Sequence, residues 1–119
     1  MKIEGPAKQL RIYIGDSDQW HGQSLYTAIV QRAHDQGLAG ATVLHGVEGY
    51  GATTRIHTAR ILRLAEDLPV VIDIIDREER INDFLPVLDE MVTEGLVIVQ
   101  DVEVIRYIGN PKPPKSRQA

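Results

Sequence analysis

The chain has 119 residues, of which 43% are hydrophobic and 25% are charged, and it carries a formal net charge of −4 and no cysteine. These values exclude a disordered chain, a disulfide, a thiolate metal site and a thiol nucleophile, and no apolar run approaches the roughly 20 residues that a membrane-spanning helix needs. The negative charge argues against a nucleic-acid surface, and residues 1–6 lack the apolar core of a signal peptide, so we expect a cytoplasmic protein.

The first half of the chain predicts a strand, a helix and a second strand. In residues 8–15 every second side chain is apolar, as in a half-buried strand. A polar loop over residues 16–21 comes next, and from Gly22 apolar residues recur at helical spacing until Gly37, a typical helix stop. Residues 41–47 predict the second strand.

The second half of the chain opens on an unusually long connection over residues 48–67. Connections of this length in small domains are usually functional or disordered. Residues 68–75 then predict a third strand that is apolar on both faces except at Asp73, as in a doubly covered strand. Residues 96–107 predict the last strand, with a bulge or bend expected near residues 100–101.

The clearest helix of the sequence begins at Asp76. Asp76 and Glu79 have the spacing of a capping box, and an apolar stripe follows them at helical spacing. Pro86 interrupts the hydrogen-bond ladder, so we expect a kink there, and Gly95 ends the helix. The stripe consists of Ile81, Phe84, Leu85, Leu88, Met91 and Val92.

The order of these elements predicts an α+β fold of the ferredoxin-like βαββαβ type over residues 1–109, followed by a solvated, basic, proline-rich tail over residues 110–119. In this fold two helices cover one face of a four-stranded antiparallel sheet. The other face carries apolar residues from the third and fourth strands, and such a patch is normally buried by a partner. We therefore expect a homo-oligomer in which sheets pack face to face, with a trimer as the closed form suggested by analogy.

A glycine cluster follows the second strand and is the strongest candidate for a ligand site. The backbone N–H groups of Gly46, Gly49 and Gly51 are suited to holding a phosphate or a carboxylate, with Arg55 or Arg60 supplying positive charge. Arg63 is a further candidate for that charge. The alternative is a turn that needs glycine only for its backbone angles.

Metal-site and enzyme interpretations have less support. Asp16, Asp18 and His21 share one loop with metal-ligand chemistry, but they match no motif of fixed spacing, and a solvated loop with a helix cap accounts for them better. His45 and His57 flank the glycine cluster, and Glu48 beside His45 is the only acid/base pair suggested. No nucleophile motif is present, so we predict that the protein is not an enzyme.

Several blocks of the sequence closely resemble the PII-like family known as domain-of-unknown-function family 190, over residues 8–107. The blocks are Tyr13-Ile14-Gly15, Gly40 to Val43, Gly49-Tyr50-Gly51, Ile56-His57-Thr58 to Leu64, Asp67 to Ile72 and Val102 to Tyr107. The resemblance implies a trimer of the PII signal-transduction superfamily, with a long loop after strand two and adenine nucleotides bound in clefts between subunits. It also implies a membrane-protein partner such as a fluoride channel.

The sequence departs from the family at three places. The turn Thr93-Glu94-Gly95-Leu96 lacks the Gly-Asp-Gly-Lys phosphate-binding loop of true PII proteins, so that loop is not carried over. His45 stands where arginine is usual, which removes one fixed positive charge unless the imidazole is protonated. Tyr50 stands where phenylalanine is common.

The leading hypothesis is a PII-like regulator that binds a small anionic ligand, AMP, ADP or ATP, between subunits and regulates a partner through its loop. Tyr50 would stack on the base and Arg55, Arg60 or Arg106 would meet phosphate. The candidate ligand-binding residues are His45, Gly46, Glu48, Gly49, Tyr50, Gly51, Arg55, Arg60 and Arg106. The alternatives are a metal-responsive trimer resembling the copper-tolerance A type and a protein-interaction module without a ligand.

Overall fold

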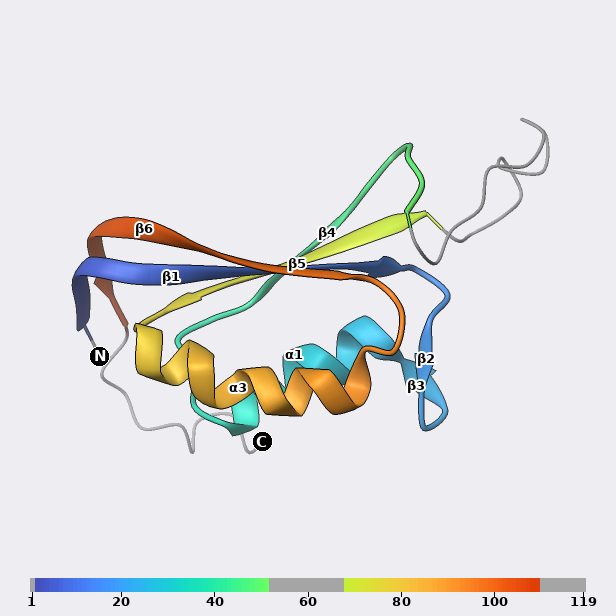
Figure 1. The fold of residues 1–119 in the computed structure, drawn as a ribbon, viewed down its shortest axis with the longest axis horizontal. Coiled ribbons are helices and arrows are strands. Elements are labelled where there is room, and N and C mark those ends of the chain that lie inside the picture. The colour runs from blue at the N-terminus through green and yellow to red at the C-terminus, as the bar shows by residue number, and fades with distance from the viewer. Residues whose placement is uncertain (1, 52–67, 110–119) are drawn as a thin grey trace.

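A computed structural model describes residues 2–51 and 68–109 of the chain. The strands are β1 (Lys2–Gly15), β2 (Gln19–Trp20), β3 (Gln23–Ser24), β4 (Thr42–His45), β5 (Pro69–Asp76) and β6 (Leu96–Ile108), and the helices are α1 (Leu25–Asp35) and α3 (Glu78–Met91). The main sheet is antiparallel with the order β4-β5-β1-β6. Both helices lie on the same side of it, so the predicted ferredoxin-like α+β fold is confirmed (Figure 1).

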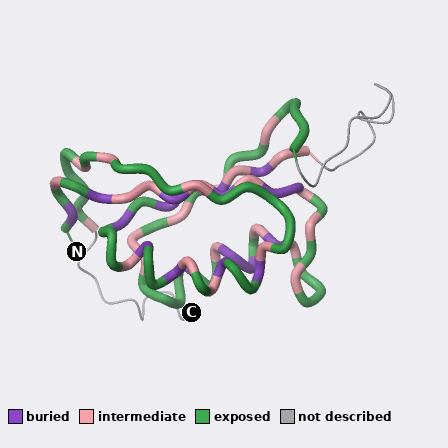
Figure 2. Tube along the Cα trace, viewed as in Figure 1, coloured by how far each residue is buried: buried purple, intermediate pink, exposed green. Residues whose placement is uncertain are grey.

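The hydrophobic core fills the space between this sheet and the two helices (Figure 2). The predicted apolar faces of the first strand and of both helices supply it, as their periodicity requires. Its fully buried members include Leu10, Ile12, Ile29, Ile72, Ile74, Ile81, Phe84 and Leu88. The opposite face of the sheet carries no helix, so its side chains stay partly exposed in a single chain.

The first helix begins later than predicted. A helix from Gly22 is wrong, because His21 and Gly22 both have positive φ, 48° and 86°, and form the turn of a small hairpin between β2 and β3. Turns with two such residues match the twist of a hairpin and cannot continue into a helix. The predicted stop at Gly37 is confirmed: Gly37 has φ 87°, and the next N–H, that of Leu38, donates to Ala33 O at 3.1 Å.

The start and end of α3 also correct the sequence prediction. The residue before the helix is Arg77, with extended backbone and no side-chain cap, so the capping box of Asp76 and Glu79 is wrong. The helix runs through Pro86 and ends at Met91, before Gly95. The kink at Pro86 stays a prediction.

Strands β1 and β6 form the longest ribbon of the sheet. The bend expected near residues 100–101 is wrong, because β6 continues through them and the register shifts instead between Ile3 and Gly5. Gly5 has φ 91°, which suits glycine at such an irregularity. Past it the ribbon bends toward the helices, where Tyr107 Oη donates to Ala39 O at 2.9 Å (Figure 1).

Two further sequence predictions concern segments that the structure does not describe. The tail over residues 110–119 lies outside them, as does most of the long connection, residues 52–67. Among the helices that the structure does describe, none has the length and apolar character to cross a membrane.

Candidate functional site

The glycine cluster lies at one end of the sheet, together with the ends of three other segments. Gly46 follows β4 and its N–H donates to the carbonyl of Pro69 at 2.8 Å, while Asp16, after β1, donates its N–H to Leu68 at 2.9 Å. The turn at Gly95, before β6, reaches the same end, since Tyr13 pairs with Leu96. We call this region the loop end, because Gly51 and Leu68, the described residues on either side of residues 52–67, belong to it.

Two of the cluster's glycines have a structural reason to be glycine. A Cβ on Gly46 would meet Pro69 O at 3.1 Å, and a Cβ on Gly49, whose φ is 152°, would meet Pro69 Cγ at 3.2 Å. The Gly46 N–H already donates to Pro69 O, and the role of Gly46 in ligand binding stays a prediction. A Cβ on Gly51 would meet nothing within 4 Å, so close packing does not explain that glycine.

His45 is held by a carboxylate that the sequence did not connect with it. Its Nε2 lies 3.1 Å from Asp16 Oδ1, and the ring of Tyr26 stands edge-on to the imidazole with centroids 5.3 Å apart. Because a carboxylate accepts hydrogen bonds, Asp16 Oδ1 is placed as the acceptor for an N–H at His45 Nε2. Glu48, the predicted acid/base partner, is exposed and is not the carboxylate that His45 contacts.

The remaining predicted residues are spread more widely. Tyr50 is 69% exposed, as suits a side chain offered to a ligand. Arg55 and Arg60 lie outside the described residues, as does His57. Arg106 lies near the opposite end of the sheet, since its neighbour Tyr107 pairs with Ile3, so one chain does not bring it to the glycine cluster.

The predicted metal-ligand loop does not gather its side chains. Asp16 faces His45, Asp18 accepts a hydrogen bond from the Gly15 N–H at 3.0 Å, and His21 stacks on Trp20 with centroids 4.1 Å apart. Within residues 2–51 and 68–109 no group of three His, Cys, Asp or Glu side chains is placed to hold a metal ion. The described residues therefore do not support the copper-tolerance alternative.

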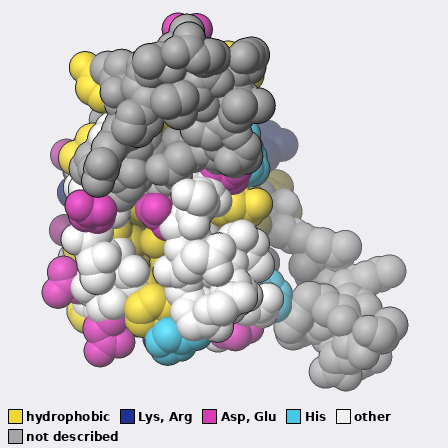
Figure 3. Space-filling view, turned by 90° about the vertical axis from the view of Figure 1, so that its right-hand side faces the viewer, with side chains coloured by type: hydrophobic (Ala, Val, Ile, Leu, Met, Phe, Trp, Pro, Cys, Tyr) yellow, Lys and Arg dark blue, Asp and Glu magenta, His cyan; other side chains and the backbone are white. Residues whose placement is uncertain are grey.

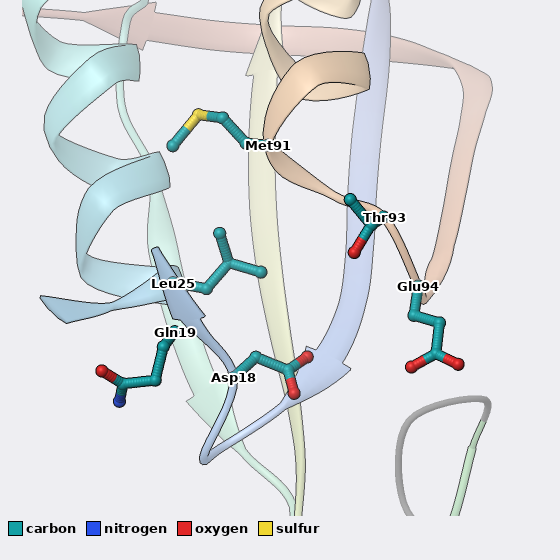
Figure 4. A pocket seen from close by; sticks show the side chains of 6 residues that line it. All are labelled: Asp18, Gln19, Leu25, Met91, Thr93 and Glu94. Atoms are coloured by element: carbon teal, nitrogen blue, oxygen red, sulfur yellow. The ribbon is translucent and has the colours of Figure 1, made fainter. Parts of the chain in front are cut away.

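A small pocket lies beside the turn that replaces the PII phosphate loop. Its volume is about 130 Å³, and its side chains come from the β1–α1 connection, the start of α1 and the end of α3 (Figure 4). They are Asp18, Gln19, Leu25, Met91, Thr93 and Glu94. With two carboxylates and no cation in this lining, the pocket does not suit a phosphate.

The loop end is poor in positive charge. Residues 12–31, 42–51, 68–76 and 81–105 contain no Lys or Arg. Viewed from this side, the visible described side chains include several Asp and Glu, with Lys or Arg only at the margin (Figure 3). The described residues at the loop end therefore supply no Lys or Arg for an anionic ligand, whereas residues 52–67 and 110–119, which lie outside the described ranges, contain both basic and neutral residues.

The comparison with family models decides the family. The model of DUF190, described as "Uncharacterized ACR, COG1993", matches residues 7–104. The chain belongs to the DUF190 family. Two relatives, the UPF0166 protein of Aquifex aeolicus (strain VF5) and the UPF0166 protein MJ1524 of Methanocaldococcus jannaschii, are 40% and 39% identical to it. The alignments cover 82% and 84% of this chain and 92% and 93% of the relatives.

Solved structures similar to this DUF190 chain include CPII from Thiomonas intermedia K12, a nitrogen regulatory PII-like protein. One CPII structure, bound to ADP, AMP and bicarbonate, matches with a TM-score of 0.54 and 21% identity over 87% of this chain and 91% of that one. Another, bound to ADP, AMP and acetate, matches with a TM-score of 0.55 and 18% identity over 92% and 94%. At these identities the likeness establishes the PII-like fold.

Proposed function

We propose that this DUF190 protein is a PII-like regulator without catalytic activity, which binds an adenine nucleotide at the loop end, where copies of the chain meet. The observation that carries the proposal is the match to CPII structures bound to ADP and AMP. The glycine-rich exit of β4 supports it, because the long connection of the PII-like fold starts there. The partner, including a membrane protein such as a fluoride channel, stays a prediction.

The uneven distribution of cations supports a site between molecules. The loop end of one chain offers Tyr50 as an exposed ring for the adenine, but its described part brings no Lys or Arg. In the proposed cleft Arg55 and Arg60 meet the phosphates from the same chain, and Arg106, at the far end of β6, comes from a neighbouring copy. A closed trimer, with the open faces of the sheets packed together, would place both ends in one cleft.

The electrostatics of the loop end favour nucleotides with few phosphates. Asp16 places a carboxylate beside His45, and the turn Thr93-Glu94-Gly95-Leu96 has an acidic residue and no lysine, so each added phosphate meets less positive charge than in true PII proteins. We expect AMP or ADP to bind more tightly than ATP.

Titration calorimetry with AMP, ADP and ATP tests the proposal. Tyr50→Ala should weaken nucleotide binding about 3- to 10-fold through lost stacking, without affecting the fold, because the ring is 69% exposed. Val47→Ala is the matched control, since Val47 is 93% exposed on the same segment and has no role in the proposal. No heat with any nucleotide at millimolar concentration would refute nucleotide binding.

A glycine variant tests whether Gly51 takes part in ligand binding or only in forming the turn. Gly51→Val adds a side chain in open space and should weaken binding without loss of stability. Gly49→Val is less informative, because the strained backbone and the contact with Pro69 would also destabilise the fold. Unchanged affinity in Gly51→Val would mean that Gly51 takes no part in the site.

A further inference from the structure

The open face of the sheet, which α1 and α3 leave uncovered, carries a connected set of polar side chains. Gln9, Arg11 and Tyr13 come from β1, Asp73 comes from β5 and Gln100 comes from β6. They share this face because they alternate with the buried residues of their strands and pair across it: Arg11 stands opposite Asp73, and Gln9 opposite Gln100. We call these five residues the polar ladder.

Hydrogen bonds join the ladder across three strands. Gln9 Nε2 donates to Asp73 Oδ1 at 2.9 Å, and Gln100 Nε2 donates to Gln9 Oε1 at 2.8 Å. Arg11 Nη2 lies 3.5 Å from Asp73 Oδ2, and Arg11 Nη1 lies 3.4 Å from Tyr13 Oη. The hydrogen bond to Tyr13 and the charge of Asp73 raise the pKa of Arg11 above its ordinary value, so the guanidinium keeps its charge.

The ladder is surrounded by apolar side chains. Leu44, Val71 and Leu96 lie in the row that contains Tyr13, and Ile75 and Ile98 stand opposite Gln9 and Arg11. Leu44 and Leu96 are 50% and 52% exposed and Ile75 is 38% exposed. A contiguous apolar patch of this kind marks a surface that another molecule covers.

The ladder is already partly withdrawn from water in one chain. The side chain of Asp73 is 21% exposed and that of Arg11 is 35% exposed. Arg11 Nε is buried and has no hydrogen-bond partner in the single chain. Because an unpaired buried donor is costly, a rearrangement that gives Nε an acceptor would be favourable when the face is covered.

We propose that the polar ladder determines how copies of this chain associate through their open faces, which rests on the self-association proposed above. Arg11 and Asp73 are the only formal charges on this face within residues 7–15, 42–45, 69–76 and 96–104. They balance one another, so an identical face can cover them without a net like charge, whereas a strongly charged partner would gain nothing. Only arrangements that keep both groups bonded are stable, which selects one register.

Charge reversal tests this proposal in the absence of nucleotide. Arg11→Asp puts a second carboxylate beside Asp73, and Asp73→Arg puts a second guanidinium beside Arg11. Each variant alone should need at least about a hundred-fold higher concentration to assemble than the unmodified chain, by light scattering or native mass spectrometry. An equimolar mixture should assemble at a lower concentration than either variant alone, because in a mixed trimer two of the three contacts join a negative face to a positive one.

Lys8→Asp is the matched control. Lys8 forms an ion pair with Asp101 across the same two strands, β1 and β6. Its side chain lies on the face of the sheet opposite to that of Arg11, the helix-side face that also carries Leu10. It changes the charge by the same amount as Arg11→Asp, and it should leave assembly unchanged.

Four results would overturn the inference. Single reversals that assemble like the unmodified chain would remove the ladder from the interface, and so would a mixture that assembles no better than its components. If the reversals do not fold, the assembly of Arg11→Met and Asp73→Asn is measured instead. The inference is overturned if both of these variants assemble like the unmodified chain. An unmodified chain that stays monomeric would also refute the proposed cleft, whereas missing nucleotide binding alone would leave the ladder intact.

Discussion

Gly95 and Gly40 differ in whether the fold requires glycine at that position. Gly95 has φ 147°, and a Cβ there would lie 2.7 Å from the carbonyl oxygen of Tyr13. The turn before β6 therefore needs glycine both for its backbone angle and for close approach to β1. Gly40 has space around it and no positive φ, so its backbone accepts other residues.

Gly95→Ala should destabilise the fold by about 2–4 kcal/mol, because backbone atoms cannot move aside as a flexible side chain does. Urea denaturation followed by circular dichroism measures this loss. Gly40→Ala is the control and should be neutral or stabilising by up to about 1 kcal/mol, since it only restricts the unfolded chain. Equal stabilities of the two variants would contradict the close contact at Gly95.

The Lys8 ammonium donates a hydrogen bond to Asp101, and this bond raises the pKa of Lys8 above its ordinary value of 10.5. A raised pKa in the folded state means that the pair stabilises the fold below pH 10.5, and that this contribution is lost as the pH rises through the folded-state pKa. NMR titration of the Lys8 side chain should give a midpoint above 10.5, and Asp101→Asn should lower it. An unchanged midpoint in Asp101→Asn would show that the pair does not persist in solution.

At the scale of elements, Asp76 connects two parts of the fold instead of capping a helix. Its side chain is fully buried, one oxygen accepts the Ala39 N–H at 2.9 Å and the other accepts the Arg77 N–H at 2.7 Å. The spacing to Glu79 matched a capping box, but the connection between α1 and β4 lies close enough to use the carboxylate. Tertiary contact thus decided the role of a residue whose local pattern predicted another.

Asp76→Ala should destabilise the protein by about 1–3 kcal/mol, because it leaves two part-buried N–H groups, those of Ala39 and Arg77, without their acceptor. Asp76→Asn keeps one acceptor oxygen and should cost roughly half as much. Thermal unfolding of both variants beside Glu79→Ala gives the comparison, because alanine cannot serve in a capping box, whereas glutamine can. If Glu79→Ala cost as much as Asp76→Ala, the capping box would regain support.

At the scale of the whole molecule, the fold was predictable because the spacing of apolar residues along the sequence indicates which segments are strands and which are helices. Alternation in β1 and helical spacing in α3 placed the core side chains correctly, including Leu10 and Phe84. The hairpin of β2 and β3 was missed, because a turn of His21 and Gly22 depends on backbone angles that polar composition does not specify. Pairing between distant strands was also missed, because register is set by the assembled sheet.

The candidate site was predictable only in its location. The glycine cluster showed where the sheet ends, but Asp16 could be connected with His45 only through the spatial order of β4, β5 and β1. Arg106 was grouped with the cluster, although the length of β6 carries it to the opposite end of the sheet. Asp73 was noticed as the polar position of its strand, and Arg11 falls between the apolar positions of residues 8–15, yet only the register shows that the two are partners.

Self-association of the open face predicts that stability depends on protein concentration. If the folded chain is a trimer and the unfolded chain is a monomer, tenfold dilution removes about 0.9 kcal/mol of stability per chain, which lowers the melting temperature by roughly 3–5 °C. Scanning calorimetry at two concentrations measures this shift. Arg11→Met, which weakens the proposed interface, should melt lower and at a temperature that no longer depends on concentration.

AMP or ADP should raise the melting temperature of the unmodified chain more than that of Arg11→Met, because a ligand held between copies stabilises only the assembled state. A concentration-independent melting temperature of the unmodified chain, alike with and without nucleotide, would refute both the assembly and the cleft.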